Sequence, residues 1–165
     1  MEVRILPFKY YTMFVRDCMV SKIVTVPFTA TIQEAVKILV SNKISGAPVV
    51  DGTNKLIGIV TEKGIFRKLY PSYNEFNEEE SAFWNFERIE SRAAEVANLK
   101  VVEVMSPKVI CVHPDFPLAK AGGLILAKSI HRLVVTDNGK EDGEIVGILT
   151  RNDIYKALFR KEFEI

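Results

Sequence analysis

One short stretch occurs twice in the sequence, and it carries the side chains that could do chemistry. The second copy, GILTRND, ends with Thr150 and Asp153 three residues apart, whereas the first, GIVTEKG, has Thr61 but ends in Gly64. The Asp153 carboxylate could accept hydrogen bonds from both vicinal hydroxyls of a ribose, of which a deoxyribose offers only one. The Thr150 hydroxyl would lie beside free amides at a helix start, where the helix dipole favours a phosphate.

A second interpretation of the same residues needs no ligand. A Thr followed three residues later by an acid, just before an apolar helix, is close to a capping box. The tetrapeptide alone favours this cap, because such caps are common at helix starts. The repeat favours a ligand, because the first copy should form the same helix with Gly64 in place of the acid. We therefore predict an intact site at Asp153 and a degenerate one at Thr61.

The stretch closes a longer repeat. Each copy begins with a Met and a β-rich run, MVSKIVTV from Met19 and MSPKVICV from Met105. A helix with apolar residues at i, i+3, i+4 and i+7 follows, and then two strands and a second helix. Thr31 with Glu34 predicts a capping box at the first helix. The apolar helical positions are Ile32, Ala35, Val36 and Leu39 in the first copy and Leu118, Ala121, Gly122 and Ile125 in the second.

These patterns predict a mixed α/β fold of two βαββα repeats packed sheet to sheet with pseudo-two-fold symmetry. One repeat of about 55 residues would bury too little surface to stand alone. We assign residues 10–69 to the first repeat, 70–100 to an inserted segment and 101–160 to the second repeat. The insertion is typical of an amphipathic helix that covers core or a dimer surface. Its apolar side contains Phe83, Phe86, Ile89, Ala93 and Val96, and Trp84 completes an aromatic cluster that could contact a partner.

Composition limits the classes of function. The 165 residues are 48% hydrophobic and carry a formal net charge of +1, which argues against nucleic acid as a partner. No apolar run is long enough for a bilayer and no targeting signal is apparent, so we expect a cytoplasmic protein without a membrane partner. Cys111 and His113 form only a Cys-x-His pair, so we expect no metal. Without a P-loop, nucleophile elbow or zinc-hydrolase motif, we expect no catalysis and no cofactor.

The ordered set of motifs resembles a pair of CBS domains, also called a Bateman module. The matching pieces are MVSKIVTV and MSPKVICV, ISGAPVVD and IHRLVVTD, and GIVTEKG and GILTRND. The last fits the family's Gly-hydrophobic-hydrophobic-Thr/Ser-x-x-Asp signature. The resemblance implies that adenosine-containing ligands such as AMP, ADP, ATP, S-adenosylmethionine or NAD bind in the cleft between the repeats. It also implies a homodimer and a regulated partner protein that the sequence does not identify.

The resemblance assigns a ligand-binding set to each site. In the intact site, the backbone of Ile23 and Val24 would bond the edge of the adenine, although their side chains suit an ordinary core. The signature repeat supplies Thr150, Asn152 and Asp153. Small residues that leave room for a flat base complete the site: Ser45, Gly46, Ala47 and Pro48. The degenerate site would take Thr61, Gly64 and Ile110.

His131 and Arg132 are further candidates. The stretch IHRL resembles the one that contacts phosphate in the nucleotide-sensing subunit of AMP-activated kinase, and both side chains are suitable phosphate donors. A solvated Arg beside a hydrogen-bonded His is an equal alternative. Phosphate binding there would favour AMP, ADP or ATP over S-adenosylmethionine, whose sulfonium the pair would repel.

Three functions are therefore weighed. We favour a regulatory sensor that binds one adenine nucleotide, AMP, ADP or ATP, in each chain. A structural dimerisation module with a vestigial pocket would instead show no stabilisation by nucleotides. A nucleic-acid binder would show an affinity that falls steeply with salt, through a basic rim of Lys22, Lys43, Lys108 and Lys128.

Overall fold

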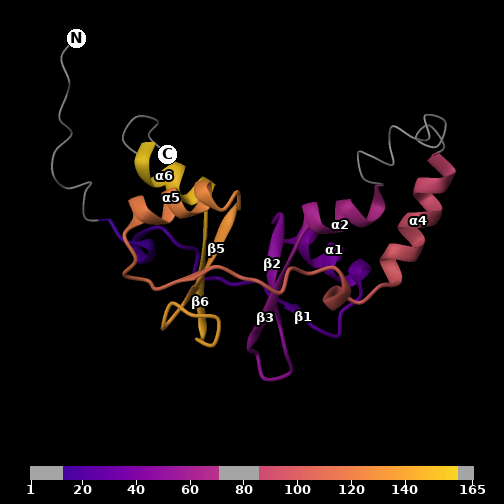
Figure 1. The fold of residues 1–165 in the computed structure, drawn as a ribbon, viewed down its shortest axis with the longest axis horizontal. Coiled ribbons are helices and arrows are strands. Elements are labelled where there is room, and N and C mark those ends of the chain that lie inside the picture. Colours follow the sequence, from indigo (N-terminus) through magenta and orange to yellow (C-terminus); the bar gives the residue numbers. More distant parts are fainter. Residues whose placement is uncertain (1–12, 71–85, 160–165) are drawn as a thin grey trace, which may run out of the picture. The chain divides into compact units, whose positions relative to one another are not determined.

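The computed structural model describes residues 13–70 and 86–159, which form two compact units. Unit 1 comprises Met1–Ile23 with Val109–Ile165, and unit 2 comprises Val24–Lys108. Each unit contains one three-stranded sheet and the two helices of one repeat (Figure 1). The predicted order of strand, helix, strand, strand and helix is therefore confirmed in both copies.

The two sheets share one topology. In unit 2, β1 pairs parallel with β2, and β2 pairs antiparallel with β3; in unit 1, β4, β5 and β6 repeat this arrangement. The elements of unit 2 are β1 (Val26–Pro27), α1 (Ile32–Ser41), β2 (Gly46–Val50), β3 (Leu56–Thr61), α2 (Glu62–Leu69) and α4 (Phe86–Asn98). Those of unit 1 are β4 (Cys111–Val112), α5 (Leu118–Ala127), β5 (Arg132–Thr136), β6 (Ile145–Thr150) and α6 (Arg151–Phe159). A 3-10 turn also occurs in each unit, at Val15–Asp17 and Val101–Glu103.

The segment before each repeat packs in the unit of the other repeat. The Val15 amide donates to the Phe116 carbonyl at 2.9 Å in unit 1, and the Val101 amide donates to the Ala30 carbonyl at 2.9 Å in unit 2. The units therefore differ from the contiguous ranges of the sequence assignment, since residues 13–23 group with the second repeat. Matching bonds in the two units reflect the internal repeat.

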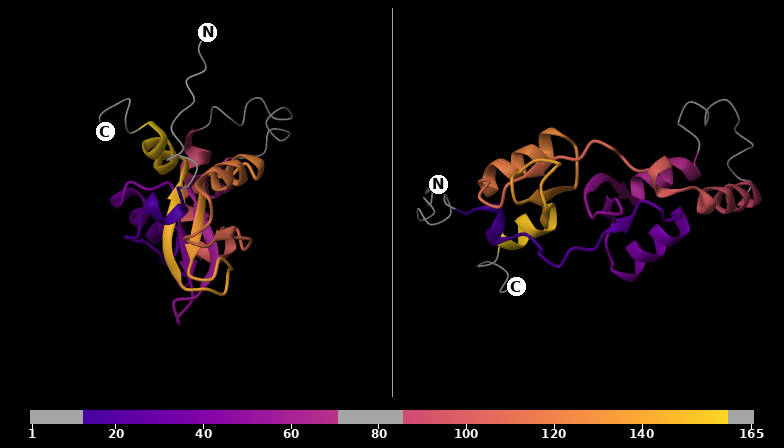
Figure 2. Two further views of the ribbon diagram at one scale, coloured as in Figure 1. Left: turned by 90° about the vertical axis from the view of Figure 1, so that its left-hand side faces the viewer. Right: turned by 90° about the horizontal axis from the view of Figure 1, so that it is seen from below.

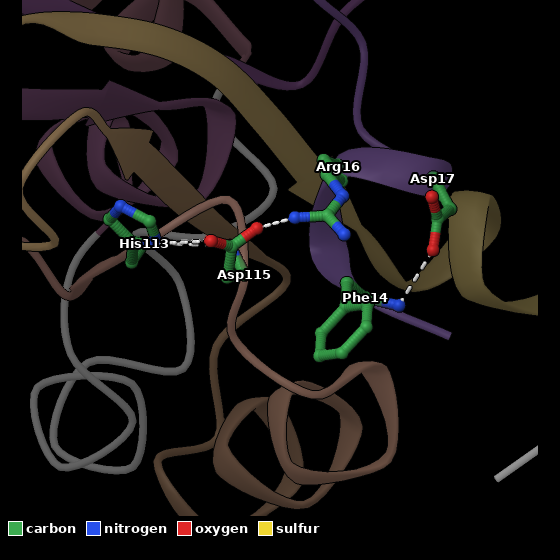
Figure 3. Close-up of polar contacts among 5 residues, drawn as sticks. All are labelled: Phe14, Arg16, Asp17, His113 and Asp115. Atoms are coloured by element: carbon green, nitrogen blue, oxygen red, sulfur yellow. Dashed lines mark hydrogen bonds and ion pairs between the residues drawn. The ribbon is translucent and has the colours of Figure 1, made fainter. Parts of the chain in front are cut away.

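Polar contacts fasten the first of these segments to the loop before α5 (Figure 3). Arg16 forms an ion pair with Asp115, and its guanidinium lies 4.8 Å from the centre of the Phe14 ring. The Asp115 amide donates to His113 Nδ1 at 3.0 Å, and the Phe14 amide donates to Asp17 Oδ2 at 2.8 Å. Because these groups are solvent-exposed, they fix the position of the segment more than they stabilise the fold.

Each unit has its own hydrophobic cluster, and the clusters confirm three of the four predicted stripe positions in each first helix. The prediction was wrong for Val36, which is 38% exposed, and Gly122 is half-buried. In unit 2 the buried positions of α1 are Ile32, Ala35 and Leu39, and in unit 1 those of α5 are Leu118, Ala121 and Ile125. The predicted capping box of α1 is also present. The Thr31 amide donates to Glu34 Oε2 at 2.7 Å and the Glu34 amide donates to Thr31 Oγ1 at 3.2 Å.

The insertion contributes α4, which packs against α1 and α2 (Figure 2). Val96 of α4 is buried in the unit 2 cluster, and Ile89 and Ala93 are half-buried on the same predicted stripe. Phe83 and Trp84 of the predicted aromatic cluster lie outside the described residues. The described part of this helix is therefore a cover for the first pair of repeat helices.

Candidate functional site

The signature of the second repeat lies where β6 ends and α6 begins. The Thr150 amide and hydroxyl both donate to Asp153 Oδ2, at 2.8 and 2.6 Å, and the Asp153 amide donates to Thr150 Oγ1 at 3.3 Å. These bonds form the capping box considered above as the alternative interpretation. They use one carboxylate oxygen only: Asp153 Oδ1 accepts no hydrogen bond from any described residue. A cap and a ligand contact are therefore compatible at Asp153.

The first repeat forms the same helix start without a carboxylate. The Gly64 amide donates to Thr61 Oγ1 at 3.1 Å, and α2 follows directly. A Cβ atom at Gly64 would lie 3.4 Å from Thr61 Oγ1 and 3.6 Å from the Val104 carbonyl, which are ordinary contact distances. Crowding at the Cβ position therefore does not account for the missing acid.

Two basic side chains lie at the same corner as the signature. Strand register places Arg132, the first residue of β5, directly opposite Thr150, and Arg132 is half-buried. His131 is exposed, and the Arg151 guanidinium contacts its ring, with Nη2 3.3 Å from Nε2. The Arg151 amide also donates to the His131 carbonyl at 3.3 Å. Arg151 was not singled out from the sequence, although it stands inside the quoted signature.

The residues assigned to adenine show a difference between the repeats that the sequence reasoning missed. The β-rich run predicts a strand at Ile23 and Val24, but both residues are half-buried in irregular backbone before β1. In unit 1 the Val134 amide donates to the Ile110 carbonyl at 3.2 Å. Pro48 occupies the matching place in β2 and has no N–H to donate. The Val24 carbonyl therefore accepts no hydrogen bond from any described residue.

The assigned residues fall into two groups, one in each unit. Unit 1 brings together Arg132, Thr150 and Asp153, with Asn152 exposed on α6 and Ile23 in the N-terminal segment. Unit 2 brings together Val24 and β2, where Gly46, Ala47 and Pro48 are buried and Ser45 just before them is exposed. Glu62, the first residue of α2, donates its amide to the Ser45 carbonyl at 3.0 Å. Of the degenerate set, Thr61 and Gly64 lie in unit 2 and Ile110 in unit 1.

Other chemistry has little support in the described part of the chain. There, no three His, Cys, Asp or Glu side chains gather in a way that could hold a metal ion. Cys111 is half-buried, and burial, with a smaller effect of Glu141, raises the pKa of its thiol to about 11. A thiol with this pKa is protonated at neutral pH and is a poor nucleophile. No helix of the described residues has both the length and the apolar character needed to cross a membrane.

A family model for the CBS domain matches residues 15–71 and 101–160. The chain belongs to the CBS domain family. The two matched ranges cover both repeats, so the CBS pair predicted from the motifs is confirmed. CBS pairs are typically regulatory modules, and solved members of the family bind adenosine ligands.

Three similar proteins illustrate the match to the CBS pair. An uncharacterized protein of Methanocaldococcus jannaschii is 31% identical over 157 residues, covering 88% of this chain and 91% of that one. The crystallised CBS domain of a membrane protein from Sphaerobacter thermophilus is 29% identical, with a TM-score of 0.68 over 90% of this chain and 89% of that one. The CBSX2 protein in complex with AMP is 26% identical, with a TM-score of 0.65 over 90% of this chain and 98% of that one. Of several other curated relatives this chain spans between 13% and 56% of the length.

Proposed function

We propose that this CBS pair is a non-catalytic regulatory module that binds one adenine nucleotide, AMP, ADP or ATP, in each chain. The observation that carries the proposal is the Asp153 carboxylate. Its Oδ2 holds the α6 cap, while its Oδ1 accepts no bond from a described residue and suits the vicinal hydroxyls of a ribose. The AMP complex of the similar CBSX2 protein supports this ligand class. The proposal includes a homodimer and a regulated partner protein, as the family resemblance implies.

Unit 2 supplies the proposed contacts to adenine. The exocyclic amino group of adenine is a donor, and the Val24 carbonyl is an acceptor without a partner among the described residues. Pro48 causes this vacancy, because a residue with an N–H at that place would bond the Val24 carbonyl. Gly46 and Ala47 beside it are small, which would let a flat base approach the β2 backbone closely.

The same two features explain why we propose one site and not two. The second set has Gly64 where the ribose acceptor would be, and its Ile110 carbonyl already accepts from Val134. It therefore lacks both the ribose acceptor and the free adenine acceptor. Arg132, beside Thr150, is the cation proposed for the phosphate.

The test compares Asp153→Ala with Glu34→Ala by isothermal titration with AMP and 2′-deoxy-AMP. Both substitutions remove the acid of a capping box, so both affect a helix start. Only Asp153→Ala removes the proposed ribose acceptor, and it should weaken AMP binding about ten- to a hundredfold, which corresponds to about 1.5–3 kcal/mol for bonds to a charged acceptor. Wild-type protein should bind 2′-deoxy-AMP more weakly than AMP.

The outcomes separate the proposed site from its alternatives. Equal losses of affinity in the two variants would show that the loss of a helix cap, and not the loss of a ribose contact, weakens binding. Unchanged binding in Asp153→Ala would overturn the site assignment. A protein that binds none of AMP, ADP and ATP, yet sediments as a dimer, would be the structural dimerisation module.

A further inference from the structure

A methionine in each unit lies against a glycine of the sheet. A Cβ atom at Gly147 in β6 would lie 2.6 Å from Met19 Sδ, and one at Gly58 in β3 would lie 2.5 Å from Met105 Sδ. Real Cβ atoms do not come this close to another heavy atom, so each sulfur occupies the space that a side chain on the strand would need. The two thioethers therefore fill matching places in the two units.

Both methionines lie at the boundary between a hydrophobic cluster and solvent. Met19 packs against the cluster of unit 1 and Met105 against that of unit 2, and both residues are half-buried. The residues that follow, 20–22 and 106–108, are exposed. Each methionine is therefore the last residue with apolar packing before an exposed stretch of chain.

An antiparallel bridge follows each methionine. Val20 and Ile148 exchange two backbone hydrogen bonds, at 2.9 and 3.0 Å, and Ser106 and Ile59 exchange two at 2.9 Å. Both bridges are isolated and do not extend into a ladder among the described residues. In both units the bridged strand residue comes directly after the glycine. One bridge and one thioether thus hold each segment against the outer strand of its sheet.

The chain passes from one unit to the other in these two segments. Unit 1 ends at Ile23, where unit 2 follows, and unit 2 ends at Lys108, where unit 1 resumes. We call residues 19–23 and 105–108 the crossover segments, and Met19 and Met105 the crossover methionines. Because the methionine comes first in each segment, a chemical change at its sulfur acts where the chain leaves a unit.

We propose that the crossover methionines are sites of reversible oxidation, and that methionine sulfoxide at these positions frees the crossover segment from its strand. Hydrogen peroxide is the oxidant, and it is small enough to reach a half-buried side chain. The thioether sulfur takes one peroxide oxygen, the O–O bond breaks, and the other oxygen leaves as water. The sulfur is oxidised by two electrons and the peroxide is reduced by two.

The new oxygen does not suit the contact with the glycine. A sulfoxide is polar, and burying its oxygen without a donor costs free energy. The nearby strand amides are engaged, because Ile148 donates to the Val20 carbonyl and Ile59 donates to the Ser106 carbonyl. The sulfoxide must therefore turn to solvent or compete for a bridge amide, and either movement weakens the bridge. The inference does not depend on the proposed nucleotide.

The test treats the full chain with hydrogen peroxide and follows amide hydrogen exchange by nuclear magnetic resonance. Peptide mass spectrometry locates the added oxygen, which should be present at Met19 and Met105. Exchange at the amides of Ile148 and Ile59, the bridge amides, should then accelerate at least tenfold, because local opening exposes them. Methionine sulfoxide reductases of both epimer specificities should restore slow exchange.

The chain offers a matched control. Met13 is also half-buried against the cluster of unit 1 but lies outside the crossover segments, so its oxidation should leave the bridge amides unchanged. A chain with both Met19→Leu and Met105→Leu keeps apolar side chains of similar volume, and its bridge amides should exchange equally before and after peroxide. This variant retains Met13, Cys18 and Cys111, so it reports any effect of their oxidation.

Each other result overturns the proposal. Oxygen on Met13 but on neither crossover methionine would show that the two sulfurs are out of reach. Oxidised crossover methionines with unchanged exchange would show that the thioethers do not hold the segments. Accelerated exchange in the double Leu variant would assign the effect to another residue. Equal acceleration at the Ala35 and Ala121 amides, in α1 and α5, would show that oxidation unfolds the units. Should the double variant fail to fold, exchange in the wild type that stays fast after the reductases remove the oxygen would also contradict the proposal.

Discussion

Gly58 in β3 and Gly147 in β6 occupy matching places, and each lies against the methionine that begins the other repeat. A Cβ atom at Gly147 would lie 2.6 Å from Met19 Sδ and 3.1 Å from its Cγ. A Cβ atom at Gly58 would lie 2.5 Å from Met105 Sδ, and also 2.9 Å from the Ser106 carbonyl oxygen. We expect both Gly→Ala substitutions to destabilise, but to respond differently to removal of the methionine.

The two substitutions differ because a side chain must move at Gly147, whereas backbone must also move at Gly58. At Gly147 only Met19 side-chain atoms are crowded, and a flexible thioether can shift, so overpacking costs about 1 kcal/mol. At Gly58 the Ser106 carbonyl is also crowded, and it accepts the Ile59 amide at 2.9 Å, so the cost is about 3 kcal/mol. Replacing Gly by Ala also raises the free energy of unfolding by about 0.4–1 kcal/mol, because Ala restricts the unfolded chain. The net free energy of unfolding should fall by up to about 0.6 kcal/mol for Gly147→Ala and by about 2–2.6 kcal/mol for Gly58→Ala.

Urea unfolding followed by circular dichroism measures these values in two double-mutant cycles. In a Met19→Ala background, Gly147→Ala should become stabilising, because the nearest remaining atom, the Met19 Cβ, is 3.4 Å away. In a Met105→Ala background, Gly58→Ala should stay destabilising, because the Ser106 carbonyl remains. Equal rescue in both cycles would refute the reasoning that backbone crowding at Ser106 sets the larger cost.

Three further predictions concern single residues. Pro48→Val should supply an amide to the Val24 carbonyl, which raises the free energy of unfolding by about 1 kcal/mol and weakens AMP binding about fivefold; urea melts and calorimetry measure the two effects. Because the pKa of the Cys111 thiol is raised to about 11, alkylation of Cys111 in a Cys18→Ser chain should keep accelerating up to about that pH, and stability should fall as pH rises from the ordinary thiol pKa to that value. Bonds from the Thr31 amide, and then the Thr31 hydroxyl, lower the pKa of Glu34, so its stabilising effect is present above the ordinary carboxyl pKa and is lost as pH falls through the lowered one. In thermal melts, the melting temperature of Glu34→Gln should therefore fall less at acid pH than that of the wild type.

Each of these predictions has a result that would contradict it. Stability and AMP affinity that change in the same direction in Pro48→Val would exclude competition for the Val24 carbonyl. An alkylation rate that levels off near pH 9 would show that Cys111 titrates as an ordinary thiol. If the melting temperatures of wild type and Glu34→Gln fell equally at acid pH, the charge of Glu34 in the α1 cap would not contribute to stability.

Much of the fold could be predicted from the sequence because the repeat occurs twice. Apolar positions with helical spacing located the buried stripes of α1 and α5, except at Val36, and Thr31 with Glu34 located the start of α1. The Thr150 and Asp153 motif predicted a helix start correctly, since local bonds determine it. Such features depend on neighbours in the sequence, so one chain is enough to find them.

Other features depend on contacts between distant segments, and the sequence pattern did not reveal them. The segment at Val15 packs with the second repeat through a bond to Phe116, which no local pattern indicates. The strand expected at Ile23 and Val24 is absent, because pairing begins only at Val26. The sequence does show that Pro48 stands where the second repeat has Val134. Only the register of the strands, however, shows that this Pro leaves the Val24 carbonyl without a donor.

Calorimetric titration of AMP into the wild-type chain tests the central claim most directly. We predict one AMP per chain, with weaker binding of 2′-deoxy-AMP, because one set of residues has both the Asp153 carboxylate and a free Val24 carbonyl. Two equivalent sites per chain, or equal affinity for AMP and 2′-deoxy-AMP, would contradict this account.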